Sequence, residues 1–193
     1  MPTIKITDAT VEPLTLPEAK AHLREEQDET HNDLLITSLI TVARQTAEDR
    51  LQRTLIDSTL LRTMETFPRC GGHIELIRPR VLSVQWVKYL APDGTLTTLD
   101  PAAYELDPTA EPGLLMPAYG TSWPATRQRP GAVQVQYKAG YGTTAAAVPK
   151  PIVQWIKLAL GELFENRSRS AERPVLPQEF ADGLLDTYKI WSV

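Results

Sequence analysis

Cysteine is nearly absent from this chain of 193 residues, and other features that would mark a class of protein are absent too. The single cysteine, Cys70, excludes an internal disulfide framework and suits a reducing cytoplasm. No uncharged apolar run approaches the ~18 residues that a helix needs to span a bilayer. The N-terminal stretch MPTIKITDATVEPLTL has no apolar core of the signal-peptide type, so we expect a soluble protein without a recognisable export signal.

An excess of basic charge is also missing. The chain has 20 Lys and Arg against 24 Asp and Glu, a formal net charge of −4, which argues against a protein that grips nucleic acid through a basic surface. The acids concentrate in residues 1–57, which hold 11 acids and 6 bases. The pairs Glu25-Glu26 and Asp28-Glu29 belong to this part, and their pattern favours a solvated face over acid–base chemistry.

The apolar pattern changes along the chain from helical to β and back to helical. Thr15 with Glu18 three positions later forms a capping box, which predicts a short helix from about residue 16. A longer helix is predicted from about Asn32 to Arg53, because apolar residues recur there every three or four positions. Its apolar stripe consists of Ile36, Leu39, Ile40, Ala43, Ala47 and Leu51.

From Ser58 onward the apolar period shortens towards two, which predicts β-strands. Six segments have this character: TLLRTMETF, HIELI, LSVQWVKYL, TLTTL, AYELD and AVQVQYKAGY. The sequence APDGT between two of them predicts a hairpin turn, because proline fixes one backbone φ and glycine accepts a positive φ. Residues 114–116 are a candidate for a further short strand, and a long irregular loop is expected after them.

The helical period returns near the C-terminus. A helix is predicted to begin at Pro149 and Pro151 and to end near Asn166. Its apolar face consists of Ile152, Trp155, Ile156, Ala159, Leu160, Leu163 and Phe164. The polar segment NRSRSAERP follows, and then a last amphipathic piece that contains several large apolar residues on one side.

These patterns predict an α+β fold. In it the N- and C-terminal helices form one helical bundle, and an antiparallel β-rich region projects from this bundle as an insertion. We expect an N-terminal helical part over residues 1–57, the β-rich insertion over 58–144, and a C-terminal helical part over 145–193 with a tail segment from about residue 167. The two longest apolar stripes, near residues 36–43 and 155–163, should pack against each other.

The sequence AGYGTT at residues 139–144 raises the question of a phosphate cradle, because it stands between a strand and a helix. A cradle requires consecutive backbone N–H groups at a helix N-terminus and a lysine that reaches the phosphates. Here the helix begins at least six residues after Gly142, and Pro149 and Pro151 contribute no N–H. Lys150 lies between these prolines rather than after a glycine. The glycines therefore indicate a corner at the end of a strand.

A metal- or thiol-dependent enzyme is one alternative that the residues leave open. Cys70 and His73 are three positions apart, which could give two metal ligands or a thiol with a base. A closed zinc site needs four ligands, and no second Cys/His pair exists, because His22 and His31 lie in the N-terminal helical section. The spacing therefore favours a loop between two strands, and we expect no catalytic residue, metal or cofactor.

Several weak motifs occur in a fixed order along the chain. They are LTLPEAKAHLR, DLLITSLITVARQTAEDRLQRTLI, a strand ending in ETFP, the hairpin VLSVQWVKYLAPDGTLTTLDPAAYELD, WP before GAVQVQYKAGYG, and VPKPIVQWIKLALGELFENR. In this order, over about Leu14 to Arg167, the chain resembles the head-tail connector (adaptor) proteins of long-tailed bacteriophages and of the related prophages and gene transfer agents. The pattern departs from the family at Arg80, where a second proline is expected, and the part after Arg169 matches no family motif.

The resemblance implies a structural part of a virion rather than a catalyst. Such connectors assemble as a ring, usually twelvefold, beneath the portal of a DNA-filled head, extend the DNA channel and dock the next neck or tail component. It further implies synthesis in the host bacterial cytoplasm, a place in the virion neck, DNA that passes through the lumen without tight binding, and no membrane. A non-viral soluble helical and β binding module of another assembly is the alternative.

The C-terminal segment from Asn166 is the candidate for the portal or subunit interface. It contains arginines and large apolar groups, the residue types that dominate interfaces, at Arg167, Arg169, Arg173, Phe180, Leu184, Tyr188 and Trp191. A helix of about fifteen residues is marginal alone in water, so packing must hold it. The segment either reaches a neighbouring subunit or the portal, or folds back on its own bundle, and the sequence leaves both open.

Overall fold

The computed structural model describes residues 3–69, 71–166 and 179–190, and the chain divides into two compact units. Met1–Ala9 and Asp57–Tyr141 form the first, which we call the β unit. Thr10–Ile56 and Gly142–Val193 form the second, the α unit. Among the described residues, no helix is long and apolar enough to cross a membrane.

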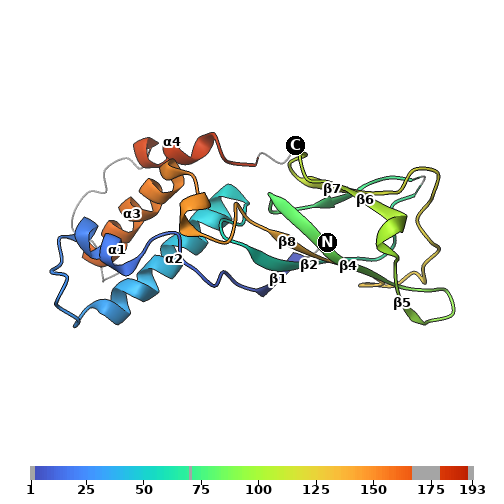
Figure 1. Ribbon diagram of the computed structural model, residues 1–193, viewed down its shortest axis with the longest axis horizontal. Helices are drawn as coiled ribbons and strands as arrows, with labels where there is room; N and C mark the ends of the chain where they lie inside the picture. The colour runs from blue at the N-terminus through green and yellow to red at the C-terminus, as the bar shows by residue number, and fades with distance from the viewer. Residues whose placement is uncertain (1–2, 70, 167–178, 191–193) are drawn as a thin grey trace. The chain divides into compact units, whose positions relative to one another are not determined.

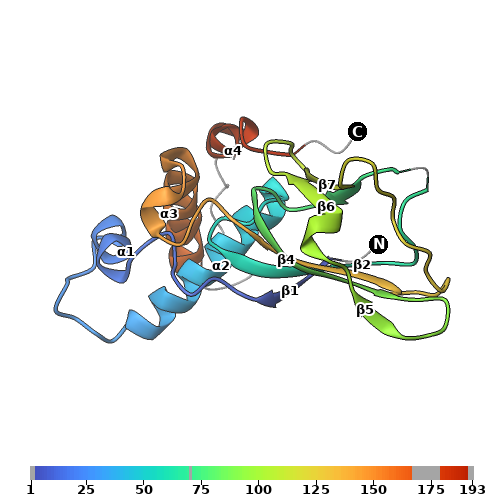
Figure 2. The same cartoon turned by 45° about the vertical axis from the view of Figure 1, so that its right-hand side comes forward.

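The α unit contains the four α-helices that the structure describes: α1 (Leu16–Leu23), α2 (Asp33–Leu51), α3 (Lys150–Glu165) and α4 (Glu179–Asp186). Helices α2 and α3 run side by side, α1 contacts both of them, and α4 packs on α3 (Figures 1 and 2). A short 3-10 turn, η2 (Ala145–Ala147), precedes α3. Helices α2 and α4 leave a groove along part of α3, which is described below.

Local sequence signals set the helix ends. The predicted capping box is confirmed, because the Thr15 backbone N–H donates to the Glu18 carboxylate at 3.0 Å and the Glu18 N–H donates to the Thr15 hydroxyl at 3.4 Å. The hydrogen bonds from the Thr15 backbone and then from its hydroxyl hold the pKa of Glu18 below its ordinary value. Helix α3 begins at the prolines, as predicted, and ends at Glu165.

The core of the α unit lies between α2 and α3. Nine residues of the two predicted stripes are buried: Ile36, Ile40, Ala43, Ala47, Leu51, Ile152, Trp155, Ile156 and Leu160. The predicted pairing of these helices is therefore confirmed. Leu39 and Leu163, which belong to the same stripes, are only half-buried because they lie toward the edges of the contact.

The β unit contains two antiparallel sheets. The first has the strand order β1 (Thr3–Thr7), β2 (Ser58–Met64), β8 (Val133–Ala139), β4 (Val81–Leu90) and β5 (Leu96–Thr98). The second has the order β3 (Ile74–Leu76), β7 (Gly113–Pro117) and β6 (Tyr104–Asp107), with a 3-10 turn η1 (Pro101–Ala103) before β6. Figure 1 shows the two sheets facing each other within this unit.

A separate hydrophobic core fills the space between the two sheets. Strand β8 alternates buried and half-buried residues along its whole length, as expected for a strand with one face in a core. Its buried residues meet Leu60 of β2 and Leu115 of β7 in one cluster. Tyr137 is fully buried, its hydroxyl donates to the Ile77 carbonyl, and burial raises the pKa of Tyr137.

The expectation of a helical bundle with a β-rich insertion is wrong. The described residues form eight strands in two antiparallel sheets beside four α-helices, so the protein is a sheet-rich fold. Residues 3–7, expected in the helical part, instead form β1, which pairs with β2 through Thr3↔Arg62 and Ile4↔Leu61. The physical reason is that the β unit recruits the N-terminus as an edge strand and buries a core of its own.

Candidate assembly interface

The structure describes only part of the predicted interface. Four of its seven residues lie outside the described residues: Arg167, Arg169, Arg173 and Trp191. Phe180 belongs to α4, but its side chain also lies outside what the structure describes. Leu184 and Tyr188 are described and half-buried. Their role in contact with another protein stays a prediction.

The described part of this segment packs on its own unit. Leu185 of α4 is buried, and α4 contacts α3. Beyond α4, the Arg53 guanidinium donates to the Tyr188 carbonyl, and the Ile190 N–H donates to the Leu51 carbonyl at 3.2 Å. The chain after α4 is thereby held at the C-terminal end of α2.

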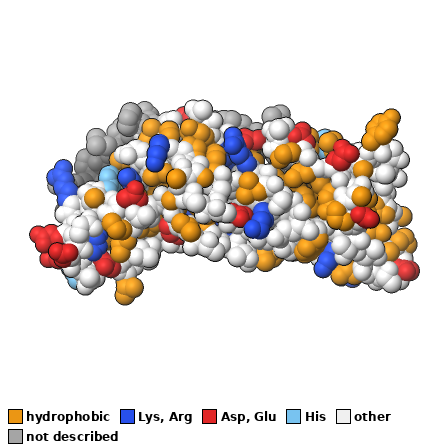
Figure 3. Space-filling model, in the orientation of Figure 1, with side chains coloured by type: hydrophobic (Ala, Val, Ile, Leu, Met, Phe, Trp, Pro, Cys, Tyr) orange, Lys and Arg blue, Asp and Glu red, His pale blue; other side chains and the backbone are white. Residues whose placement is uncertain are grey.

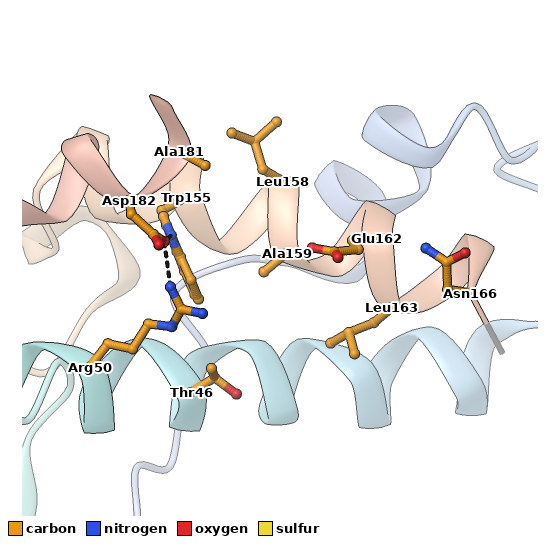
Figure 4. Close-up of a pocket in the computed structure, with 10 residues that line it drawn as sticks. All are labelled: Thr46, Arg50, Trp155, Leu158, Ala159, Glu162, Leu163, Asn166, Ala181 and Asp182. Atoms are coloured by element: carbon orange, nitrogen blue, oxygen red, sulfur yellow. Dashed lines mark hydrogen bonds and ion pairs between the residues drawn. The ribbon is translucent and has the colours of Figure 1, made fainter. Parts of the chain in front are cut away.

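A groove of about 300 Å³ opens between α2, α3 and α4 (Figure 4). Helix α3 provides most of its wall, largely through apolar side chains, and α2 and α4 close its sides. The lining residues are Thr46, Arg50, Trp155, Leu158, Ala159, Glu162, Leu163, Asn166, Ala181 and Asp182. An open apolar groove with polar groups at its rim is typical of a surface that receives a side chain of another molecule.

Charged groups close one end of the groove. Arg50 of α2 forms an ion pair with Asp182 of α4 and lies over the Trp155 ring, with its guanidinium carbon 5.2 Å from the ring centre (Figure 4). The Trp155 Nε1–H donates to Asp182 Oδ1 at 3.2 Å. Arg50 and Asp182 are both substantially exposed, so their ion pair adds little to the stability of the fold. Its main effect is to hold the two side chains in place beside Trp155.

Sequence reasoning missed this groove. Arg50 and Asp182 are 132 positions apart, so no local spacing could pair them. Trp155 was assigned to the helix core, and it is buried there, but the edge of its ring also faces the groove. Leu158 is an apolar residue outside the predicted stripe, and no other feature of the sequence hints at this surface.

The acidic segment forms the connection between α1 and α2. Side chains of Glu26, Asp28 and Glu29 are exposed, which confirms the predicted solvated face, and red side chains gather at this connection in Figure 3. The buried Lys20 ammonium holds the segment by donating to the carbonyls of Gln27 and Glu29 and by pairing with Asp33.

No described cluster supports a metal or thiol site around residue 73. Cys70 lies outside the described residues, and His73 is exposed in a shallow depression beside Arg69 and Glu75. Within the described ranges, one group has the ligand types and spacing to hold an ion, formed by Glu25, Glu29 and His31. All of it lies in the exposed acidic connection, where such groups are common without an ion.

The glycines at residues 140 and 142 form a corner, as predicted. Gly140 has a φ of 148°, and its N–H donates to the Arg80 carbonyl at 2.9 Å instead of facing an open site. A Cβ at Gly142 would lie 2.9 Å from the Ala147 Cβ, which explains the second glycine as a close approach to η2.

Comparison with known proteins gives one result. No family model and no curated protein matches the chain. Among solved structures, the chain is similar to a virion neck component, with the likeness extending over its full length. This component belongs to the neck of an empty gene transfer agent particle computed with C6 symmetry, with a TM-score of 0.81 and 21% identity over 100% of this chain and 97% of that chain.

Two further structures agree with the first. A chain in the virion of a native gene transfer agent particle matches with a TM-score of 0.81 and 22% identity over 100% of this chain and 97% of that one. A chain in the neck of the native particle computed with C12 symmetry matches with a TM-score of 0.76 and 22% identity over the same shares. At these identities the likeness establishes the fold.

Proposed function

We propose that this chain is a structural virion protein, a head-tail connector that assembles as a twelvefold ring beneath the portal. The observation that carries the proposal is the similarity to a neck chain over 100% of this chain and 97% of that chain, which leaves no unit of either fold unmatched. The order of motifs from Leu14 to Arg167, which resembles the connector family, supports the proposal independently of this similarity.

The ring and its partners follow from this role. Structures of the matched necks were computed with C6 and C12 symmetry, which supports a cyclic arrangement for this chain. A ring needs two different patches per subunit that meet heterologously. We assign the portal and the next neck or tail component as further partners, with DNA passing through the lumen of the ring and the virion neck as the location.

Catalysis is not part of the proposal. The similar structures are neck and virion structures, and none of their names indicates an activity. The described residues around residue 73 also give a thiol or metal mechanism no support, because His73 is exposed and belongs to no described group of three side chains that could hold a metal.

Gene disruption followed by electron microscopy of lysates tests the proposal. The disrupted strain should produce DNA-filled heads and separate tails that do not join, and the supplied protein should restore joined particles. Purified protein mixed with portal-bearing heads should add a ring at the portal vertex. Joined particles in the disrupted strain, or heads that fail to assemble at all, would contradict a connector role.

A further inference from the structure

We draw no further inference here: the strongest candidate, the apolar groove between α2, α3 and α4 in the α unit, carries none, because nothing in the described part of the chain shows what covers it.

Discussion

Arg44 and Glu48 form an ion pair inside the α unit, with Arg44 Nη1 3.1 Å from Glu48 Oε2 and side chains only 1% and 2% exposed. The Arg44 Nε also lies 2.7 Å from Glu12 Oε2, and the Leu55 N–H donates to Glu48 Oε1 at 2.9 Å. Glu12 precedes α1 and Leu55 follows α2, so this pair of α2 residues fixes the chain on both sides of the first two helices.

Replacing one partner should therefore be costly. Arg44→Met leaves the Glu48 carboxylate buried without its cation, and the free energy of unfolding should fall by about 3–5 kcal/mol. Urea unfolding followed by circular dichroism measures it. Arg50→Met, at the exposed pair with Asp182, is the matched control and should cost less than about 1 kcal/mol. Equal losses for the two variants would mean that burial does not govern the Arg44 pair.

The pairing of α2 with α3 predicts a second stability effect. Leu160 is fully buried between them, so Leu160→Ala should lower the free energy of unfolding by about 2–5 kcal/mol through lost burial and the cavity left behind. Leu158, two positions earlier and partly exposed in the groove, is the control, and its change to Ala should cost about 1 kcal/mol or less. A loss below about 1 kcal/mol at Leu160 would show that this stripe does not carry the core.

The capping box should make stability depend on pH in a defined direction. The pKa of Glu18 is held below its ordinary value of 4.5 by the Thr15 hydrogen bonds, so its ionised form stabilises the folded state. This contribution is fully present above pH 4.5 and is lost as the pH falls through the lowered pKa. Thermal unfolding of wild type and Glu18→Ala should differ near neutral pH, and the difference should shrink as the pH falls through the lowered pKa of Glu18. If the stability difference between wild type and Glu18→Ala stays constant with pH, the ionised carboxylate of Glu18 is not its cause.

Local patterns predicted the elements of this fold better than their assembly. The capping box at Thr15, the prolines before α3 and the alternation of β8 each depend on neighbours in the sequence, and each gave the right element. Residues 3–7 show why one element was missed. The sequence TIKIT alternates as a strand does, but it pairs with Ser58–Met64, a partner more than fifty residues away.

The global arrangement could not be read from the same patterns. Whether a β-rich region is an insertion or a unit with its own core depends on which strands meet, and Leu60 and Leu115 join one cluster only in three dimensions. The buried Arg44 had a signal in its spacing of four from Glu48, yet that spacing is equally common on exposed helix faces. The groove had only the apolar Leu158 outside the predicted stripe, because its walls come from three helices that local spacing cannot bring together.

Affinity for free DNA should be low. A lumen that held phosphates tightly would slow the passage of DNA, and the net charge of −4 supplies little attraction. In fluorescence anisotropy with a labelled duplex, the isolated protein should bind more weakly than about 10 μM at physiological salt. Salt-sensitive binding at micromolar or lower concentration would count against a channel protein of this kind.

Substitutions near the described C-terminal end should affect either the stability of the fold or the attachment to portal-bearing heads, depending on the residue. Leu185 is buried against its own unit, so Leu185→Ala should cost about 2–5 kcal/mol of unfolding free energy. Leu184 and Tyr188 are half-buried and belong to the predicted portal or subunit interface, so their change to Ala should cost roughly 1 kcal/mol. If they contact the portal or a neighbouring subunit, these two variants should nevertheless lose attachment to portal-bearing heads, as measured by co-sedimentation. Normal attachment by both would remove this face from the interface, and a loss of stability as large as that of Leu185→Ala would return both residues to the core.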